Sequence, residues 1–222
     1  RGGNGWAILA GVCAILGMAS KEVMVTAPLM ILIYDRVYVS PSWTAALTRH
    51  RTLYLGLFFS WIPLAALLTI GAHGDTVGFG RGVGAYTYAL NQIEVIASYL
   101  GSSIWPYPLL LDYGFADQEL TLRAAAPELL IIVALLGLTA LALKLNPRLA
   151  FAGIWFFLIL APTSSLVPIV SEVGAERRIY LPLLGLVSGA VVLSYHSLSR
   201  RPSRGLLVGS GLGVIVVLLL GV

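Results

Sequence analysis

Residues 127–145 read PELLIIVALLGLTALALKL, a stretch in which apolar side chains run almost without a break. An α-helix needs about 20 apolar residues to cross the hydrocarbon core of a bilayer, so this stretch predicts a membrane-spanning helix. Further apolar runs flank it between short polar breaks, at 6–19, 23–39, 53–70, 86–111, 149–160, 179–195 and 205–222. The pattern predicts an all-α fold: a polytopic transmembrane helical bundle of about seven spans plus one interfacial or re-entrant helix.

The composition agrees with this class. Hydrophobic residues make up 58% of the chain and charged residues only 11%, whereas an ordinary soluble domain is about a quarter charged. The mean hydropathy is +0.90. Residues 1–222 are therefore expected to form a single transmembrane domain. Because the chain starts at Arg1 without an initiator Met and stops inside an apolar run at Val222, it is expected to be part of a longer protein.

Basic residues predict the orientation. The net charge of +4 does not indicate nucleic-acid binding, because the Lys and Arg side chains sit in short loops between apolar runs, as they do in cytoplasmic loops of membrane proteins. If the basic loops at 36–51, 144–148 and 200–204 are all cytoplasmic, the chain crosses an even number of times between Arg51 and Lys144. Three apolar runs lie there, so one of them does not span.

The run at 86–111 is the best candidate for that element. It carries polar side chains, which are tolerated at an interface or along a cavity but are costly against lipid, and it breaks at 105–108, WPYP. We interpret it as interfacial or re-entrant. Lys21 with Glu22, the region 71–126 and the loop 163–178 then lie outside the cytoplasm, and the C-terminus also points outward.

Several groups in these outward segments could carry chemistry. Arg177 and Arg178 run against the orientation rule, and guanidinium groups bind phosphate in a fork geometry. The alternatives are that Glu176 pairs with an arginine to cap the helix, and that both arginines contact lipid headgroups. Lys21 and Glu22 are either an exposed tip or two groups that address different partners.

Other polar residues leave similar choices open. A carboxylate in the segment that begins with Asp112 and Tyr113 could bind an acceptor hydroxyl or a metal, or simply be solvated. Gln92 could bind a sugar hydroxyl or a neighbouring helix. His73 and Asp75 are too few for a metal site, and no metal is expected.

Three blocks of the chain, in order, resemble the bacterial relatives of the transmembrane and tetratricopeptide-repeat protein O-mannosyltransferases, which are GT-C superfamily glycosyltransferases. They are the run from Met18, Ser20, Lys21 and Glu22 to Pro28, Tyr34 and Asp35; the run from Tyr88, Asn91, Gln92 and Tyr99 to Pro106, Pro108, Asp112 and Tyr113; and the run from Ala161, Pro162 and Thr163 to Glu176, Arg177, Arg178, Tyr180 and Pro182.

The resemblance implies a GT-C-like fold in a multi-pass protein of the bacterial inner membrane, with its active side facing the periplasm. It implies transfer of a mannose-like sugar from a polyprenyl-phosphate donor to Ser or Thr hydroxyls of an acceptor protein. The donor phosphate would contact Arg177, Arg178 and Lys21, and the substrate pocket would contain Glu22, Gln92, Asp112, Tyr113, Glu176 and Tyr180. The catalytic carboxylate would lie in an external loop before Arg1, and tetratricopeptide repeats would follow Val222.

Two other classes fit the composition. A transporter or flippase would use the polar residues of 86–111 to line a pathway, and a non-catalytic scaffold would only anchor a repeat domain in the membrane. Related polytopic enzymes such as O-antigen ligases also fit.

Overall fold

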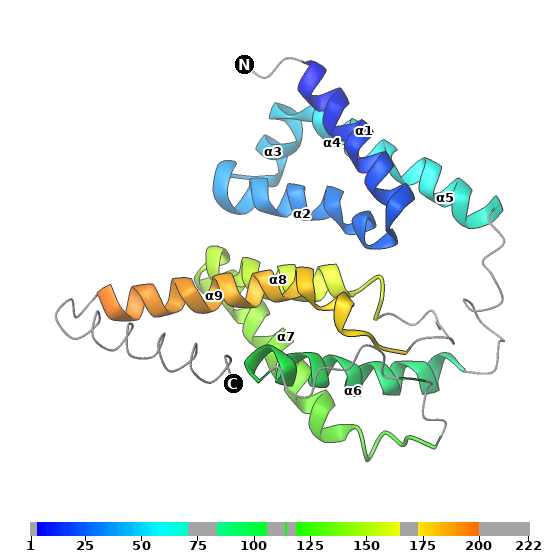
Figure 1. Cartoon of the computed structure of the whole chain (residues 1–222). Helices are drawn as coiled ribbons and strands as arrows, with labels where there is room; N and C mark the ends of the chain where they lie inside the picture. The colour runs from blue at the N-terminus through cyan, green and yellow to red at the C-terminus, as the bar shows by residue number, and fades with distance from the viewer. Residues whose placement is uncertain (1–3, 71–83, 106–113, 115–118, 165–172, 200–222) are drawn as a thin grey trace, which may run out of the picture.

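The structure, a computed structural model, describes residues 4–70, 84–105, 114, 119–164 and 173–199. Every regular element in these ranges is a helix, which confirms the all-α class for the described part of the chain (Figure 1). The elements are α1 (Asn4–Ser20), η1 (Glu22–Thr26), α2 (Ala27–Tyr34), η2 (Asp35–Val39), α3 (Trp43–Arg49), α4 (Arg51–Phe59), α5 (Trp61–Ile70), α6 (Ala85–Ile104), α7 (Ala126–Leu145), α8 (Pro147–Leu160), η3 (Glu176–Arg178) and α9 (Tyr180–Ser199).

Local sequence explains where α7 begins and ends. Pro127 lies in the first turn, where the backbone N–H that proline lacks would have no partner within the helix. Glu128 in the first turn and Lys144 in the last turn carry charges opposite to the adjacent ends of the helix dipole. Asn146 is extended, with φ −152° and ψ 90°, and it precedes Pro147, which disfavours helical geometry in the residue before it. The chain therefore stops α7 and starts α8 within two residues.

Among the described helices, α7 alone is both long and apolar enough to cross a membrane by itself. The segment 23–39 together with α3 passes the same test as a pair, but it is bent by 112°. The apolar stretches 5–20, 147–160 and 180–195 are shorter than a full crossing. Seven crossings therefore remain a prediction, and the structure establishes the coarser point that the bundle is helical and contains one helix of spanning length.

The helices place the turns of the bundle at two ends. In Figure 1, η1 and the starts of α6 and α9 lie toward the right. We call this the η3 end, because η3 comes directly before α9. The opposite end, toward the left, contains η2, α3 and the α7–α8 turn, and we call it the α7–α8 end. Packing of η2 against both α3 and α8 ties the second group together. Arg36 from the first basic loop, and Lys144 with Arg148 from the second, belong to that end, whereas the third basic loop, 200–204, lies outside the described residues.

Glycines allow the closest helix approaches. A Cβ on Gly11 of α1 would lie 3.3 Å from the carbonyl oxygen of Gly56 on α4. Gly185 and Gly189, four residues apart on α9, face α8, and a Cβ at Gly189 would lie 2.9 Å from the Cβ of Ala152. Small residues at this spacing are typical of helix pairs in membranes, where close backbone contact drives association.

Two long apolar runs are divided differently from the sequence-based expectation. The run 53–70 is broken at Ser60 into α4 and α5, because Pro63 cannot accept the geometry of a continuous helix and its ring conflicts with the carbonyl four residues earlier. The run 23–39 is divided into η1, α2 and η2. Each division occurs within the expected boundaries, so the runs were located correctly but were not single straight helices.

The run 86–111 is helical over Ala85–Ile104, and its polar face is turned inward. Tyr88, Asn91, Gln92 and Tyr99 are buried on α6, whereas Tyr86 is 66% exposed. Figure 1 shows α6 running from the η3 end toward the α7–α8 end. The hydrogen bond from Val173 N to Gly114 O, 3.2 Å, shows that the chain has returned by Gly114 to the segment that leads into η3.

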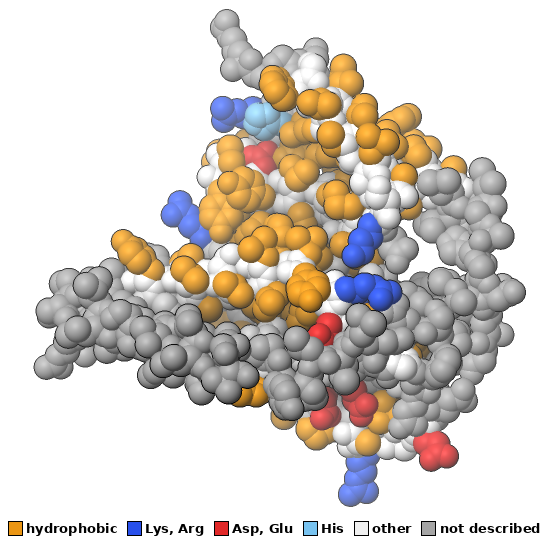
Figure 2. All heavy atoms as spheres, in the orientation of Figure 1, with side chains coloured by type: hydrophobic (Ala, Val, Ile, Leu, Met, Phe, Trp, Pro, Cys, Tyr) orange, Lys and Arg blue, Asp and Glu red, His pale blue; other side chains and the backbone are white. Residues whose placement is uncertain are grey.

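Apolar side chains dominate the outer surface. Leu130, Leu138 and Leu145 of α7 are 70%, 59% and 76% exposed, and Figure 2 shows hydrophobic side chains spread over the face in view. Soluble monomers seldom expose apolar patches larger than a few hundred Å². A lipid environment or further protein is needed to cover this surface.

Candidate functional site

The segment before η3 is inserted between α6 and α8. Val173, Ala175 and Ile179 are buried, and Val173 and Ile179 belong to one apolar cluster with Tyr99 of α6 and Phe156 of α8. The Gln92 side-chain Nε2 donates to the carbonyl oxygen of Val173 at 2.8 Å. Burial and a side-chain hydrogen bond therefore fix the backbone immediately before the two arginines.

Tyr99 holds the same segment through a reciprocal pair of bonds. Its hydroxyl donates to the Ala175 carbonyl at 2.7 Å and accepts from the Ala175 N–H at 2.8 Å. Both groups are buried, so without the hydroxyl they would lose partners that water does not replace. Gln92 and Tyr99 lie two helical turns apart on α6, so they hold residues 173–175 along one side of that helix.

Arg178 points back into this structure. One terminal nitrogen, Nη1, donates to the carbonyl oxygens of Thr163 and Val173, at 3.3 Å each. The Val173 carbonyl thus accepts from both Gln92 and Arg178. These two contacts assign the Arg178 side chain a positioning role.

The neighbouring charged residues face outward. Arg177 is exposed, Glu176 is half-buried and Tyr180 is 71% exposed. Lys21 is also exposed, in the extended residue that joins α1 to η1. Figure 2 shows basic side chains gathered where the α1–η1 turn comes close to the start of α9.

The sequence-predicted site is therefore assembled in part. The structure brings Gln92, Glu176, Arg177, Arg178 and Tyr180 together at the η3 end, and Lys21 lies at the same end. Glu22 begins η1, but the position of its side chain is not described. Asp112 and Tyr113 lie outside the described residues.

Two buried polar atoms lie in this region, one on the predicted site residue Gln92 and one on Ser164, which was not predicted. Gln92 Oε1 and Ser164 Oγ are buried and have no hydrogen-bond partner among the described residues. Ser164 directly follows Thr163, whose carbonyl receives Arg178. Buried polar atoms are almost always paired in folded proteins, so these two mark where a hydroxyl or amide from another group would be stabilised. The polar positions of α6 were a signal for Gln92, but no local pattern indicated Ser164.

An apolar groove opens beside the outward-facing cations. Its volume is about 320 Å³, and it lies between η1, α2 and α8, with Val23 and Leu181 among its lining residues. Val23 follows Lys21 by two residues and Leu181 follows Arg177 by four, so both cations lie near lining residues of the groove, although neither lines it. The indole N–H of Trp155 donates to the Leu181 carbonyl at 2.7 Å and fixes that side of the groove. Within the described residues no three His, Cys, Asp or Glu side chains lie close enough to hold a metal ion.

Removing the Tyr99 hydroxyl should loosen this site. Tyr99→Phe leaves the buried N–H and C=O of Ala175 without that partner, and each lost partner costs about 1–3 kcal/mol. We expect the free energy of unfolding in detergent to fall by at least about 2 kcal/mol. Tyr86→Phe, at an exposed position of the same helix, is the matched control. Equal stability of the two variants would show that the Tyr99 hydroxyl does not hold the segment.

No protein-family model, curated protein or solved structure matches this chain.

Proposed function

We propose that this chain is the membrane part of a glycosyltransferase that moves a mannose-like sugar from a polyprenyl-phosphate donor to Ser or Thr hydroxyls of a protein. The reaction takes place on the extracytoplasmic side, at the η3 end. The short apolar helices act as spans in combination with α7, so the protein is a multi-pass protein of the bacterial inner membrane. The resemblance of the three sequence blocks motivates this proposal.

The observation that carries it is that two exposed cations lie near lining residues of an apolar groove. Arg177 and Lys21 are exposed at the end where Val23 and Leu181 open the groove between η1, α2 and α8. A polyprenyl phosphate combines a phosphate with a long apolar tail. The cations suit the phosphate, and the groove suits the first part of the tail.

The roles of the residues follow from their surroundings. Arg177, with Lys21, binds the donor phosphate and stabilises the negative charge that grows on it as the sugar departs. Arg178 holds the backbone that presents Arg177, through Thr163 and Val173. Gln92 Oε1 and Ser164 Oγ, which are buried without a hydrogen-bond partner among the described residues, would bind hydroxyl groups of the substrate. No catalytic base is assigned among the described residues.

A transport function is the second candidate, because the unpartnered buried atoms of Gln92 and Ser164 would also suit a polar pathway through the bundle. Reconstitution distinguishes the two. The full protein in liposomes should transfer labelled mannose from polyprenyl-phosphate mannose to a peptide rich in Ser and Thr. Movement of the labelled lipid across the bilayer without transfer to peptide would contradict the enzyme and favour a flippase.

A further inference from the structure

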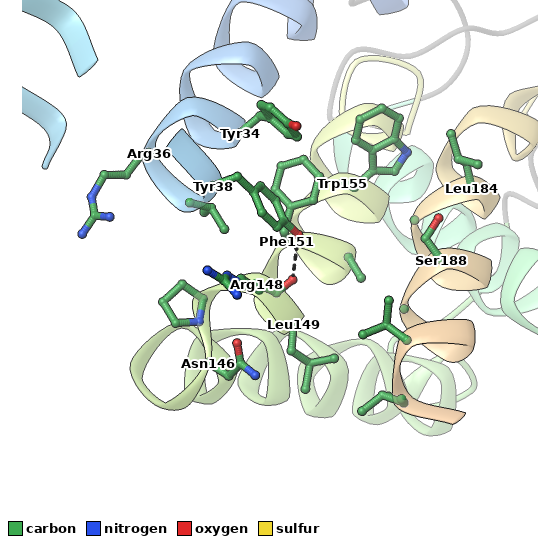
Figure 3. Close-up of a pocket in the computed structure, with 17 residues that line it drawn as sticks. Tyr34, Arg36, Tyr38, Asn146, Arg148, Leu149, Phe151, Trp155, Leu184 and Ser188 are labelled. Atoms are coloured by element: carbon green, nitrogen blue, oxygen red, sulfur yellow. Dashed lines mark hydrogen bonds between the residues drawn. The ribbon is translucent and has the colours of Figure 1, made fainter. Parts of the chain in front are cut away.

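A second, larger cavity lies at the other end of the bundle. Its volume is about 750 Å³, and it is bounded by η2, the α7–α8 turn, α8 and α9 (Figure 3). This is within the range of about 300–1,000 Å³ typical of small-molecule sites. The cavity adjoins the apolar groove described above, since Tyr34, Phe151 and Trp155 line both, but its cationic rim lies at the α7–α8 end.

One rim of the cavity is cationic. Arg148 projects from the first turn of α8 and Arg36 from η2, and Figure 3 shows Arg36 at the left of the view with its guanidinium directed outward from the cavity. The Tyr38 hydroxyl donates to the Arg148 carbonyl at 3.2 Å, which ties η2 to α8 at this rim. No carboxylate is found among the described residues that line the cavity. The rim therefore complements an anion.

Arg36 has capacity for such a partner. Its guanidinium carbon lies 5.9 Å from the centre of the Trp43 ring, which holds the side chain over that ring. Its Nε is buried and has no hydrogen-bond partner among the described residues. A donor in that position gains from an acceptor supplied by a ligand.

The rest of the cavity is apolar and extended. Phe151 packs edge-on against Tyr38, with ring centroids 5.4 Å apart, and lies 5.9 Å from Trp155. These rings form one wall, and α9 forms the other with Leu184 and the small Ser188. Figure 3 shows the walls continuing away from the arginines along α8. The site thus accepts a molecule with an anionic head and an apolar chain.

We propose that this cavity binds an anionic phospholipid of the cytoplasmic leaflet, with its phosphate against Arg148 and Arg36 and an acyl chain between the aromatic wall and α9. Phospholipids are the amphiphiles that a membrane supplies at this depth, and basic pockets between helices on the cytoplasmic side suit anionic headgroups. The lipid fills the space between η2 and the α8–α9 pair. This inference requires membrane insertion but does not depend on sugar transfer.

Lipid retention tests the proposal. The full protein is purified in mild detergent from membranes containing phosphatidylglycerol and phosphatidylethanolamine, and the bound lipid is measured by native mass spectrometry. We expect one retained phosphatidylglycerol. Affinity should fall about fivefold in Arg148→Gln and about thirtyfold when Arg36→Gln is added, since each basic side chain near the headgroup contributes a change of about fivefold.

Two further variants make the result specific. Lys144→Gln removes a charge from the same end but outside the cavity, and it should retain the lipid. Ser188→Trp fills the apolar part without changing charge, and it should lose the lipid. The proposal is overturned if Lys144→Gln lowers retention as much as Arg148→Gln, if the arginine variants and Ser188→Trp keep the lipid, or if phosphatidylethanolamine is retained equally. It is also overturned if polyprenyl phosphate, and no phospholipid, occupies the cavity.

Discussion

Replacing Arg177 with alanine should reduce sugar transfer by about 10²–10³-fold, the loss typical when one charge-stabilising group is removed from an active site. Arg177 is exposed near the apolar groove, on a backbone that Gln92 and Tyr99 hold in place. The side chain is not needed to bury apolar surface. The variant should therefore fold normally and lose activity, which is measured as the initial rate of transfer from polyprenyl-phosphate mannose at saturating peptide.

Two other arginines separate this role from a general effect of charge. Arg123→Ala removes an exposed positive charge from a turn distant in sequence and should leave the rate unchanged. Arg178→Ala removes the donor to the Thr163 and Val173 carbonyls, so it should lower both the rate and the free energy of unfolding. If Arg177→Ala transfers sugar as fast as Arg123→Ala does, Arg177 does not bind the donor phosphate.

Replacing Gly185 with leucine should prevent α8 and α9 from packing. A Cβ at this position would lie 2.6 Å from Cδ1 of Trp155 and 2.9 Å from the carbonyl oxygen of Ala152. The carbonyl belongs to the α8 backbone and cannot turn aside, so the helices must separate. We expect a loss of about 3 kcal/mol or more, at the upper end of the range for overpacking, with little folded protein recovered.

The control for this variant is Gly137→Leu on α7. No atom outside its own helix lies within 4 Å of the Cβ position at Gly137, so the leucine side chain can extend outward from the bundle. Thermal unfolding of both variants in detergent measures the difference. Comparable melting temperatures would mean that α8 and α9 are not packed through Gly185.

The helical class and several helix boundaries could be predicted because they depend on local sequence. The run predicted at 127–145 corresponds to α7, Ala126–Leu145, since apolar composition and the flanking prolines act within a few residues. The proposed re-entrant run begins where α6 begins, but the helix ends at Ile104, because Trp105 is forced into extended geometry before Pro106. The helix therefore ends at the start of the break predicted at 105–108, and residues 106–111 of the run lie outside the described residues.

The site was less accessible to prediction, because its contacts join distant residues. The hydrogen bond from Gln92 to Val173 joins residues 81 positions apart in the sequence, and the one from Tyr99 to Ala175 joins residues 76 positions apart. No local pattern specifies which side chain of α6 reaches which carbonyl. The sequence also did not distinguish Arg178, which points inward to backbone carbonyls, from Arg177, which points outward. That difference depends on the turn of η3.

The number of crossings is a further point at which sequence patterns and structure differ. Composition predicts about seven spans, but breaks such as the one before Pro63 leave helices shorter than a bilayer is thick. Charge distribution is the stronger guide here, since it places the cationic turns of Lys144 and Arg148 opposite to η3 regardless of helix length.

The central claim is that the η3 end faces outward from the cell while the α7–α8 end faces the cytoplasm. Lys21 and Lys144 are exposed lysines at the two ends, and Cys13 is the sole cysteine of the chain. Lys21→Cys and Lys144→Cys are each made with Cys13→Ser and treated with a membrane-impermeant maleimide. The account predicts that the cysteine at 21 reacts in intact spheroplasts and the cysteine at 144 reacts only after lysis. Reaction of the cysteine at 144 in intact spheroplasts, with protection at 21, would contradict it.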